Sequence, residues 1–258
     1  MTIQPRPISD EPDADLRNGK MAFLDHLDEL RTRIIRSCIA VGMGMLVAFA
    51  FYDRLSSFLL EPTLRALPPG TELIFIRPGE AFAFYLDVAL IGGLVMAAPF
   101  VMCQVWGFIA PGLYAKEKKF AIPFMLLTTV GTIAGAMFSH YIMFPAMVGF
   151  FATFHPRAMK FMPSVEYTFE LYKNLLIGLV LVFQMPTLVL FLSKMRLVTA
   201  QFLWRNIKYA ILIIFIIAAV ISPGTDVVSQ CLMAGPMLAL YGVSIFVAWA
   251  FAKPRNFA

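Results

Sequence analysis

The sequence predicts an all-α polytopic membrane protein with six transmembrane helices. Of its 258 residues, 60% are hydrophobic and only 14% are charged, whereas about a quarter of the residues of an ordinary soluble domain are charged. Six apolar runs follow one another along the chain, and four of them exceed twenty residues. A run of that length crosses a hydrocarbon core of about 30 Å at 1.5 Å per residue. Lipid is therefore the expected solvent for much of the surface.

The six expected spans differ in length. The fifth has fifteen residues and covers only about 22 Å, and the turn "SPGTD" follows it at once. The fifth and sixth spans are therefore expected to form a tight, short hairpin; one re-entrant pair is the alternative. The spans cover residues 34–52, 82–104, 120–143, 171–192, 207–221 and 227–251.

Prolines inside or beside the spans predict bent helices. Each proline removes a backbone donor, so a concave, cupped arrangement is expected, with ordinary packing irregularity as the alternative. Gly131 and Gly135, four residues apart, are expected to allow close approach of another helix. The prolines are Pro99, Pro123, Pro145, Pro186 and Pro236.

The basic residues predict the topology. Fifteen of the 21 Lys and Arg lie in the two terminal segments and the loops between spans two and three and spans four and five, and five lie in the alternate loops. Cytoplasmic loops carry this excess, so both termini are expected in the cytoplasm, and the net charge of +5 needs no nucleic-acid partner. The expected organisation is a disordered tail (1–20), a membrane domain (21–252) and a short tail (253–258).

The first outer segment, 53–81, contains a short amphipathic pattern that predicts a surface helix broken near Pro62. Its apolar positions are Leu55, Phe58, Leu59 and Leu64.

The stretch "FLDHLDELRTRII" (23–35) precedes the first span and carries charges of both signs. His26, Glu29 and Arg33 fall on one helical face, and Glu29 can pair with Arg33 at i, i+4. A self-paired interfacial helix is one interpretation. However, a topology signal requires no acidic residue, so a carboxylate here also suits a cationic partner. The apolar stripe on the other face comprises Phe23, Leu27, Leu30 and Ile34.

A second acidic residue, Glu117, lies in the first cytoplasmic loop, "YAKEKKF". Its Lys neighbours could simply neutralise it. Two carboxylates at one surface also suit two guanidinium groups, and a hydrogen bond to a charged group is worth about 1.5–3 kcal/mol.

Four further polar residues lie at or near lipid depth. Gln184 is the deepest, and its amide needs a partner, either another helix of this chain or a partner helix. Asp226 is expected to cap a helix, and Asp87 to reach interfacial water. Glu80 stands just before the second span.

Several segments together resemble the TatC family, the multispanning core subunit of the twin-arginine protein translocase. The resemblance covers residues 21–250 in order, with the same six-span layout. The segments are "HLDELRTRI" (26–34), "QVWGFIAPGLYAKEKK" (104–119), "FQMP" (183–186) and "SPGTDVVSQ" (222–230).

The resemblance implies a receptor for twin-arginine signal peptides in a prokaryotic cytoplasmic (inner) membrane. It implies Sec-independent export of folded proteins driven by the proton-motive force, with single-span TatA and TatB as partners and self-association into a multimeric receptor complex. Glu29 and Glu117 match the signal-binding acids, and His26, Arg31 and Phe108 match nearby recognition residues. Pro62, Glu80 and Asp226 match outer-side positions that matter for transport.

Gln184 departs from the family pattern, because many members have Glu there. A neutral amide carries no proton but can hydrogen-bond a polar residue of TatA or TatB, so Gln184 is expected at the partner-binding wall.

Two other classes of protein fit the sequence less well. A small-molecule secondary transporter is the alternative, although the sequence has no repeat and few polar groups at mid-membrane. An intramembrane enzyme would need a nucleophile–base pair or a metal pattern, and Cys38, Cys103 and Cys231 form no CxxC motif. No enzymatic activity, cofactor or metal is expected.

Overall fold

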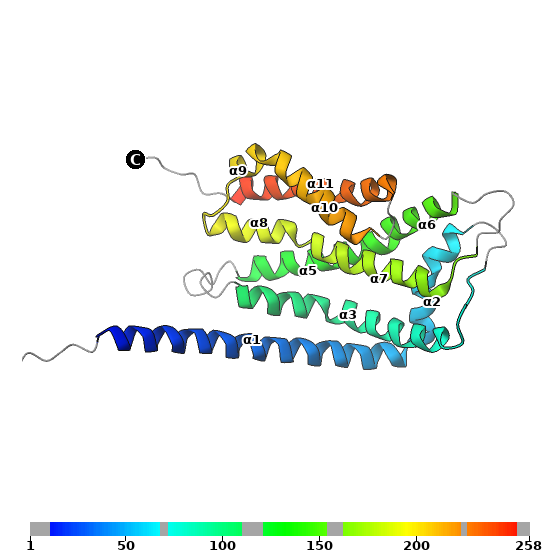
Figure 1. Cartoon of the computed structure of the whole chain (residues 1–258), viewed down its shortest axis with the longest axis horizontal. Coiled ribbons are helices and arrows are strands. Elements are labelled where there is room, and N and C mark those ends of the chain that lie inside the picture. Colours follow the sequence, from blue (N-terminus) through cyan, green and yellow to red (C-terminus); the bar gives the residue numbers. More distant parts are fainter. Residues whose placement is uncertain (1–10, 68–71, 110–120, 154–161, 223–225, 252–258) are drawn as a thin grey trace, which may run out of the picture.

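A computed structural model of the chain describes residues 11–67, 72–109, 121–153, 162–222 and 226–251 (Figure 1). The described residues are almost entirely helical, and an isolated parallel bridge joins Ile74 to Ser164. The elements are, in order, α1 (Glu11–Ala50), α2 (Tyr52–Ala66), α3 (Glu80–Ile109), α5 (Ala121–Phe138), the π-helical turn η2 (Ser139–Met143), α6 (Phe144–Thr153), α7 (Val165–Val182), α8 (Met185–Lys194), α9 (Ala200–Arg205), α10 (Ile207–Ile221) and α11 (Val227–Phe251).

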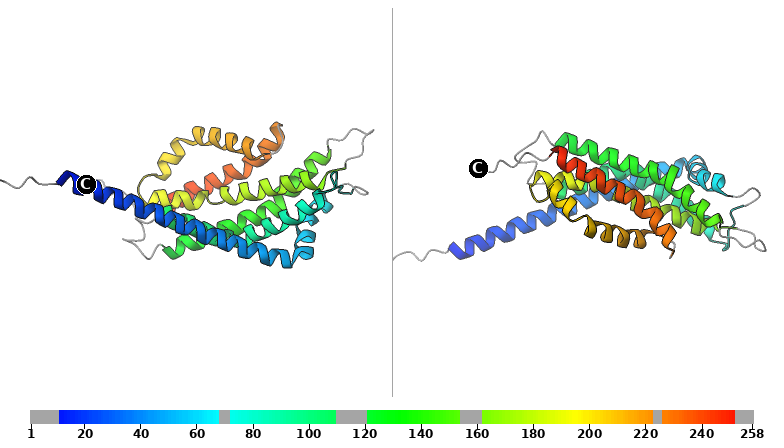
Figure 2. Two further views of the ribbon diagram at one scale, coloured as in Figure 1. Left: turned by 60° about the horizontal axis from the view of Figure 1, so that its bottom comes forward. Right: turned by 90° about the horizontal axis from the view of Figure 1, so that it is seen from above.

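Five of the helical stretches are long and apolar enough to cross a membrane, and they run roughly along the long axis of the molecule (Figures 1 and 2). The start of α1 and the end of α11 lie at one end, called here the first end, and α2 lies at the second end. The predicted all-α polytopic fold is confirmed. The five stretches are His26–Ala50, Glu80–Phe108, Phe124–Thr153, Val165–Lys194 and Val227–Ala250.

The short hairpin is predicted correctly in one of its two arms. α10 has 15 residues and covers about 22 Å, as expected for the fifth span. The predicted bounds of the sixth span, 227–251, are those of α11, but the description of this span as short is wrong, because its 25 residues cover about 37 Å. α11 continues through Pro236, and its apolar run keeps every turn compatible with lipid.

Prolines bend some spans and leave others continuous. α7 ends at Val182 and α8 begins at Met185, with Gln184 between them as the N-cap of α8. Pro186 stands in the first turn of α8, where its missing N–H costs no helical hydrogen bond. α3 continues through Pro99. Hollows of about 520 Å³ between α2, α3, α5 and α7 and about 540 Å³ between α7, α10 and α11 give the bundle the concave walls that were expected.

α1 begins at Glu11, within the segment that the sequence predicts as a tail (1–20). Pro12 is the last proline before the first span and stands in the first turn of the helix, where a proline is tolerated. The division into a tail, a membrane domain and a second tail stays a prediction.

α7 forms the centre of the bundle. Of the most apolar part of the Val165–Lys194 stretch, 61% is buried inside the protein. The corresponding value for the His26–Ala50 stretch of α1 is 11%. Leu175 and Leu179 of α7 pack with Phe144, Met147 and Met233 in the main core. Gly131 and Gly135 allow the predicted close approach, because an added Cβ would lie 2.9 Å from Phe183 O and 3.0 Å from Val180 Cα, respectively.

α1 packs mainly on α3, and two glycines bring the helix backbones into contact. A Cβ added at Gly93 would lie 2.4 Å from the backbone nitrogen of Met45, and one added at Gly44 would lie 2.7 Å from Gly93 O. Neither helix can keep this separation with a larger residue at the crossing.

Gly93→Ala is expected to destabilise the protein by about 1–3 kcal/mol, because the added methyl group overpacks a backbone contact. Thermal unfolding in detergent measures the change. Gly42→Ala is the matched control, since no heavy atom lies within 4 Å of the added Cβ. Equal melting temperatures for the two variants would contradict the close packing of α1 on α3.

The amphipathic helix predicted in the outer segment is present as α2, but the predicted break near Pro62 is wrong. α2 continues through Pro62 to Ala66. Leu59 and Pro62 are buried, whereas Phe58 and Leu64 are exposed. Burial of Leu59 and Pro62 on one face holds the helix together although the proline donates no backbone hydrogen bond.

Candidate functional site

Glu29 lies near the first end and is joined to α3 through Arg33. The guanidinium of Arg33 donates from Nε and NH2 to Glu29 Oε1, at 3.0 and 2.6 Å. Its NH1 donates to Gln104 Oε1 at 3.2 Å. The predicted Glu29–Arg33 pair is therefore confirmed, and it fixes the polar face of α1 on α3.

An aromatic stack lies beside this pair. The rings of His26 and Phe108 are 4.4 Å apart and nearly parallel, at 11°. His26 Nδ1 is 3.9 Å from Glu29 Oε2. A Cβ at Gly107 would lie 2.4 Å from Arg33 NH1, so the glycine leaves room for the guanidinium. The structure thus brings together three of the predicted site residues: His26, Glu29 and Phe108.

A groove of about 640 Å³ opens next to Glu29. Both hydrogen bonds that Glu29 accepts from the described residues end on Oε1, so Oε2 has capacity for another donor. The carboxylate is 36% exposed and the Arg33 side chain 25%. The groove is lined by Glu29, Arg33, Pro99, Phe100, Cys103, Gln104, Gly107, Met125 and Thr129.

The other two predicted site residues of this region are not part of the cluster as described. Arg31 is exposed on α1, and Glu117 lies outside the described residues. Leu27 and Ile34 of the apolar stripe are exposed. At this end the polar face of α1 packs on α3, while Leu27 and Ile34 face outward.

Gln184 lies at the junction of α7 and α8 and is only 6% exposed. Its amide nitrogen donates to Thr132 Oγ1 at 2.9 Å and to Thr128 O at 3.2 Å. This is the hydrogen bond within the chain that the sequence left open as the alternative. Its Oε1 is buried and accepts no hydrogen bond from the described residues, so docking of a partner helix at Gln184 stays a prediction.

Glu80 joins three segments at the second end. The carboxylate is 4% exposed. Its Oε1 accepts from Ser164 Oγ at 2.6 Å and Glu166 N at 2.9 Å. Its Oε2 accepts from the backbone N–H of Ile76 at 2.6 Å and of Arg77 at 3.1 Å. The side chain therefore ties the segment before α3 to the first turn of α7.

Asp226 caps α11, as predicted. Its Oδ1 accepts from the Ser229 hydroxyl at 2.7 Å, and its Oδ2 from the Ser229 N–H at 2.8 Å. These two donors hold the pKa of Asp226 below its usual range. Because the folded-state pKa is lowered, the capping contribution is present at neutral pH and is lost only as the pH falls through that lowered pKa.

Asp226→Ala is expected to lower the melting temperature of the protein, because the first turn of α11 loses its cap, whereas Asp226→Asn is expected to retain most of the stability. Asn caps a helix about as well as Asp. Thermal unfolding in detergent measures both variants. Equal loss in the two variants would show that the charge of Asp226, and not its capping hydrogen bonds, is required.

Several contacts were not predicted from the sequence. No sequence pattern marks Gln104 as a partner of Arg33 or Ser164 as a partner of Glu80. Asp87, expected to reach interfacial water, is 38% exposed and also pairs with Lys173 of α7, with 3.5 Å between Oδ2 and Nζ. In the part of the chain that the structure describes, no three His, Cys, Asp or Glu residues gather as metal ligands would.

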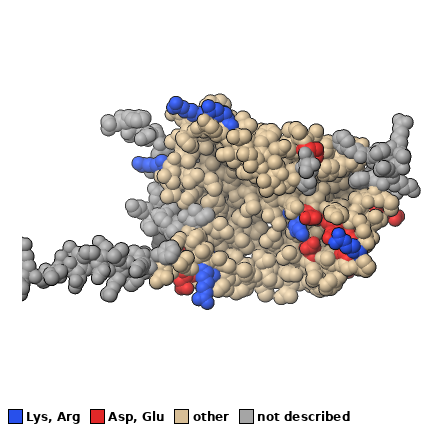
Figure 3. Space-filling model, viewed as in Figure 1, with Lys and Arg blue, Asp and Glu red and all other residues tan. Residues whose placement is uncertain are grey.

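Charged side chains on the face drawn in Figure 3 lie toward the two ends of the molecule, and a broad uncharged band separates them. This distribution fits spans that cross a bilayer between two polar ends. The Glu29 groove and the Glu80 network thus lie near opposite ends.

Comparison with known proteins identifies the family. Residues 25–236 match the family model described as Sec-independent protein translocase protein (TatC). A Sec-independent protein translocase protein TatC from Koribacter versatilis is 40% identical over 239 residues, which cover 92% of this chain and 88% of the relative. One from Desulforapulum autotrophicum is 40% identical over 237 residues, 92% of this chain and 87% of the relative.

The fold agrees with a solved structure. A crystal structure of a twin arginine translocase receptor, TatC, matches with a TM-score of 0.77 and 33% sequence identity, over 88% of this chain and 100% of that chain. A second crystal structure of the receptor, in DDM, matches with a TM-score of 0.77 and 35% identity, over 86% and 99% of the two chains. With a matching fold and a family match over most of its length, the chain belongs to the TatC family of Sec-independent protein translocase proteins.

Proposed function

We propose that this chain is the receptor subunit that binds twin-arginine signal peptides, and that the groove beside Glu29 is the binding site. The observation that carries the proposal is the Glu29 carboxylate. It is partly exposed, and its Oε2 accepts no hydrogen bond from the described residues. A guanidinium group is a planar donor that suits a carboxylate.

Arg33 supports the proposal by orienting that carboxylate. It donates only to Oε1 of Glu29 and is itself held by Gln104, so Oε2 stays in a defined position. His26 and Phe108 form a flat aromatic surface beside it, on which an arginine side chain can stack. In this proposal Glu29 binds one arginine of the signal peptide, and Glu117 binds the other.

The distribution of basic residues supports an orientation of the chain in the membrane. The segments rich in Lys and Arg include both terminal ones, and the first helix, α1, starts and the last helix, α11, ends at the first end. We infer that this end faces the cytoplasm of a prokaryotic inner membrane, where unexported proteins present their signals. TatA and TatB, assembled with several copies of this chain, complete the pathway for folded cargo, which is driven by the proton-motive force.

Photocrosslinking tests the site. A signal peptide with a photoreactive residue next to its two arginines is added to the full chain in nanodiscs. Adducts are expected on the groove, at Cys103 or Gln104 of α3 and near Glu29, and an unlabelled twin-arginine peptide should compete better than a twin-lysine one. Adducts confined to other surfaces would contradict the proposed site.

A further inference from the structure

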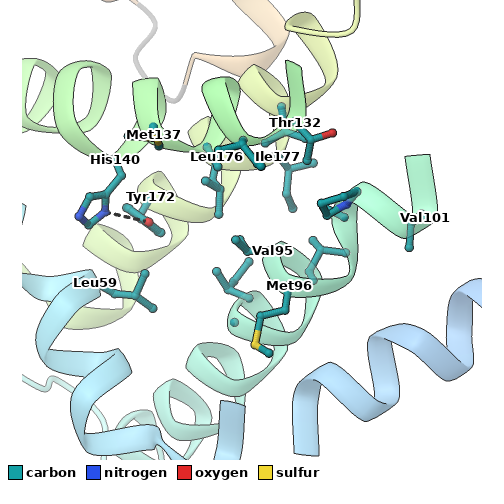
Figure 4. A pocket seen from close by; sticks show the side chains of 18 of the residues that line it. Leu59, Val95, Met96, Val101, Thr132, Met137, His140, Tyr172, Leu176 and Ile177 are labelled. Carbon is teal, nitrogen blue, oxygen red and sulfur yellow. Dashed lines mark hydrogen bonds between the residues drawn. The ribbon is translucent and has the colours of Figure 1, made fainter. Parts of the chain in front are cut away.

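An apolar cavity of about 520 Å³ lies between α2, α3, α5 and α7 (Figure 4). It adjoins the Glu29 groove at Pro99, which lines both. Met96, Met137 and Leu181 line it and are each more than half exposed on the outside of their helices. The cavity therefore opens toward the surface that faces the bilayer. No water is available at that depth to fill such a space.

His140 and Tyr172 form the polar part of the cavity wall. Each is 3% exposed, and His140 Nδ1 lies 3.1 Å from the Tyr172 hydroxyl oxygen. Phe58 stacks on the His140 ring with 4.2 Å between centroids. His140 Nε2 is buried and has no hydrogen-bond partner among the described residues.

A count of hydrogens shows what this pair lacks. A neutral imidazole carries one N–H and the phenol carries one O–H, and the bond between them uses one of the two. If Tyr172 donates to Nδ1, the Nε2–H of His140 remains; if Nδ1–H donates to Tyr172, the hydroxyl hydrogen remains. In both tautomers one buried donor has no acceptor among the described residues, which is costly at lipid depth.

The depth of the pair suits a lipid ester. The Val165–Lys194 stretch has 30 residues and covers about 45 Å, the thickness of a bilayer with its headgroup layers. Tyr172 stands seven residues after Val165, or about 10 Å along the axis. Each headgroup layer beside a hydrocarbon core of about 30 Å is roughly 7 Å thick. The unused donor therefore lies just inside the hydrocarbon boundary, next to the ester carbonyls.

The lining favours an acyl chain as the occupant. The residues around the cavity are almost all apolar, and such a surface binds a hydrocarbon chain without leaving polar groups unpaired. A flexible acyl chain can enter from the bilayer and follow the apolar wall.

The charges beside the cavity point to a zwitterionic headgroup. His140 and Tyr141 also line a smaller cavity of about 240 Å³ together with Glu61 and Arg65 of α2. Glu61 and Arg65 form an exposed ion pair. A phosphate suits the guanidinium and an amine suits the carboxylate.

We propose that this cavity is a binding site for phosphatidylethanolamine of the leaflet at the second end. One acyl chain occupies the cavity, an ester carbonyl accepts the unused hydrogen of the His140–Tyr172 pair, and the headgroup lies over Glu61 and Arg65. The lipid test detects acyl-chain adducts and the receptor test detects signal-peptide adducts, so the failure of this proposal and the failure of the receptor function are distinguishable.

The test uses the full chain in nanodiscs that contain phosphatidylethanolamine with a diazirine in the middle of one acyl chain. After irradiation, adducts are mapped by mass spectrometry. Labelling is expected to be about five-fold higher on cavity residues such as Val95 and Met137 than on exposed Ile213 of α10, because the pocket encloses the chain. The same probe built on phosphatidylglycerol is expected to label the cavity less, and equal labelling would overturn the assignment of the headgroup.

Filling the cavity provides the matched comparison. Val95→Phe is expected to lower the cavity adducts about five-fold, and Val130→Phe, on an exposed position of α5 outside the cavity, to leave them unchanged. Ile177→Phe fills the opposite wall if Val95→Phe does not fold. The double variant His140→Leu/Tyr172→Phe is expected to spread the adducts over several turns, because the ester loses its donor.

Two results would overturn the proposal. One is labelling of the cavity no stronger than that of Ile213 and unchanged by both filling variants. The other is labelling of Val95 or Met137 by a signal peptide with a photoreactive group in its apolar segment, together with loss of the lipid adducts. The occupant would then be the peptide.

Discussion

Glu29→Lys is expected to abolish measurable binding of a twin-arginine signal peptide to the purified protein. The substitution removes the acceptor of a charge-assisted hydrogen bond, worth about 1.5–3 kcal/mol, or about 10- to 150-fold in affinity. It also places a second positive charge four residues from Arg33, which repels both that side chain and the incoming arginine. Fluorescence anisotropy of a labelled peptide with protein in nanodiscs measures the loss.

Asp28→Lys is the matched control. Asp28 is exposed and adjacent to Glu29 on α1, so the change in charge is the same while the side chain projects from a different face of the helix. Its effect on affinity is expected to be small at physiological ionic strength, because exposed charges are screened. Equal weakening by the two substitutions would mean that the overall charge of the first end, and not the Glu29 carboxylate, governs binding.

Glu80→Ala is expected to lower the melting temperature of the protein by roughly 5 °C or more and to impair export. The carboxylate accepts four hydrogen bonds from two separate segments. Without it, the Ser164 hydroxyl and three backbone N–H groups lose their acceptor, and an unsatisfied buried donor costs more than a hydrogen bond gains. The first turn of α7 and the segment before α3 are then expected to separate.

Glu80→Gln distinguishes this structural role from a role for the charge. The amide oxygen can still accept two of the four hydrogen bonds, whereas the amide nitrogen would face two donors. An intermediate melting temperature is expected. If Glu80→Ala melts like the unsubstituted protein and still blocks export, the carboxylate acts in transport directly and the network is not its main role.

The spans could be predicted from the sequence because lipid imposes a simple rule on helix length and composition. The rule also gives the sixth span its correct bounds, 227–251. The error lies in inferring from the short fifth span that both arms of the hairpin are short, because α11 can extend at its other end. Pro62 was a second error. Proline removes one donor from a helix, but packing of α2 on its neighbours decides whether the helix continues, and packing is not visible in a local pattern.

The candidate site was predictable in part for a similar reason. His26, Glu29 and Arg33 share a helical face, so periodicity within one helix groups them. Gln104 is 71 residues from Arg33, and Ser164 is 84 residues from Glu80. No local pattern relates residues so far apart, and these contacts exist only because α1 packs on α3 and because the segment before α3 meets the start of α7.

The most direct test of the receptor account is the affinity of the purified protein in nanodiscs for a twin-arginine peptide beside that for the same peptide with two lysines. The account predicts about tenfold or tighter binding of the arginine peptide, with the difference reduced in Glu29→Ala and Glu117→Ala. Equal affinities for the two peptides, unchanged in both variants, would contradict it and leave the Glu29–Arg33 pair with only a structural role in holding α1 on α3.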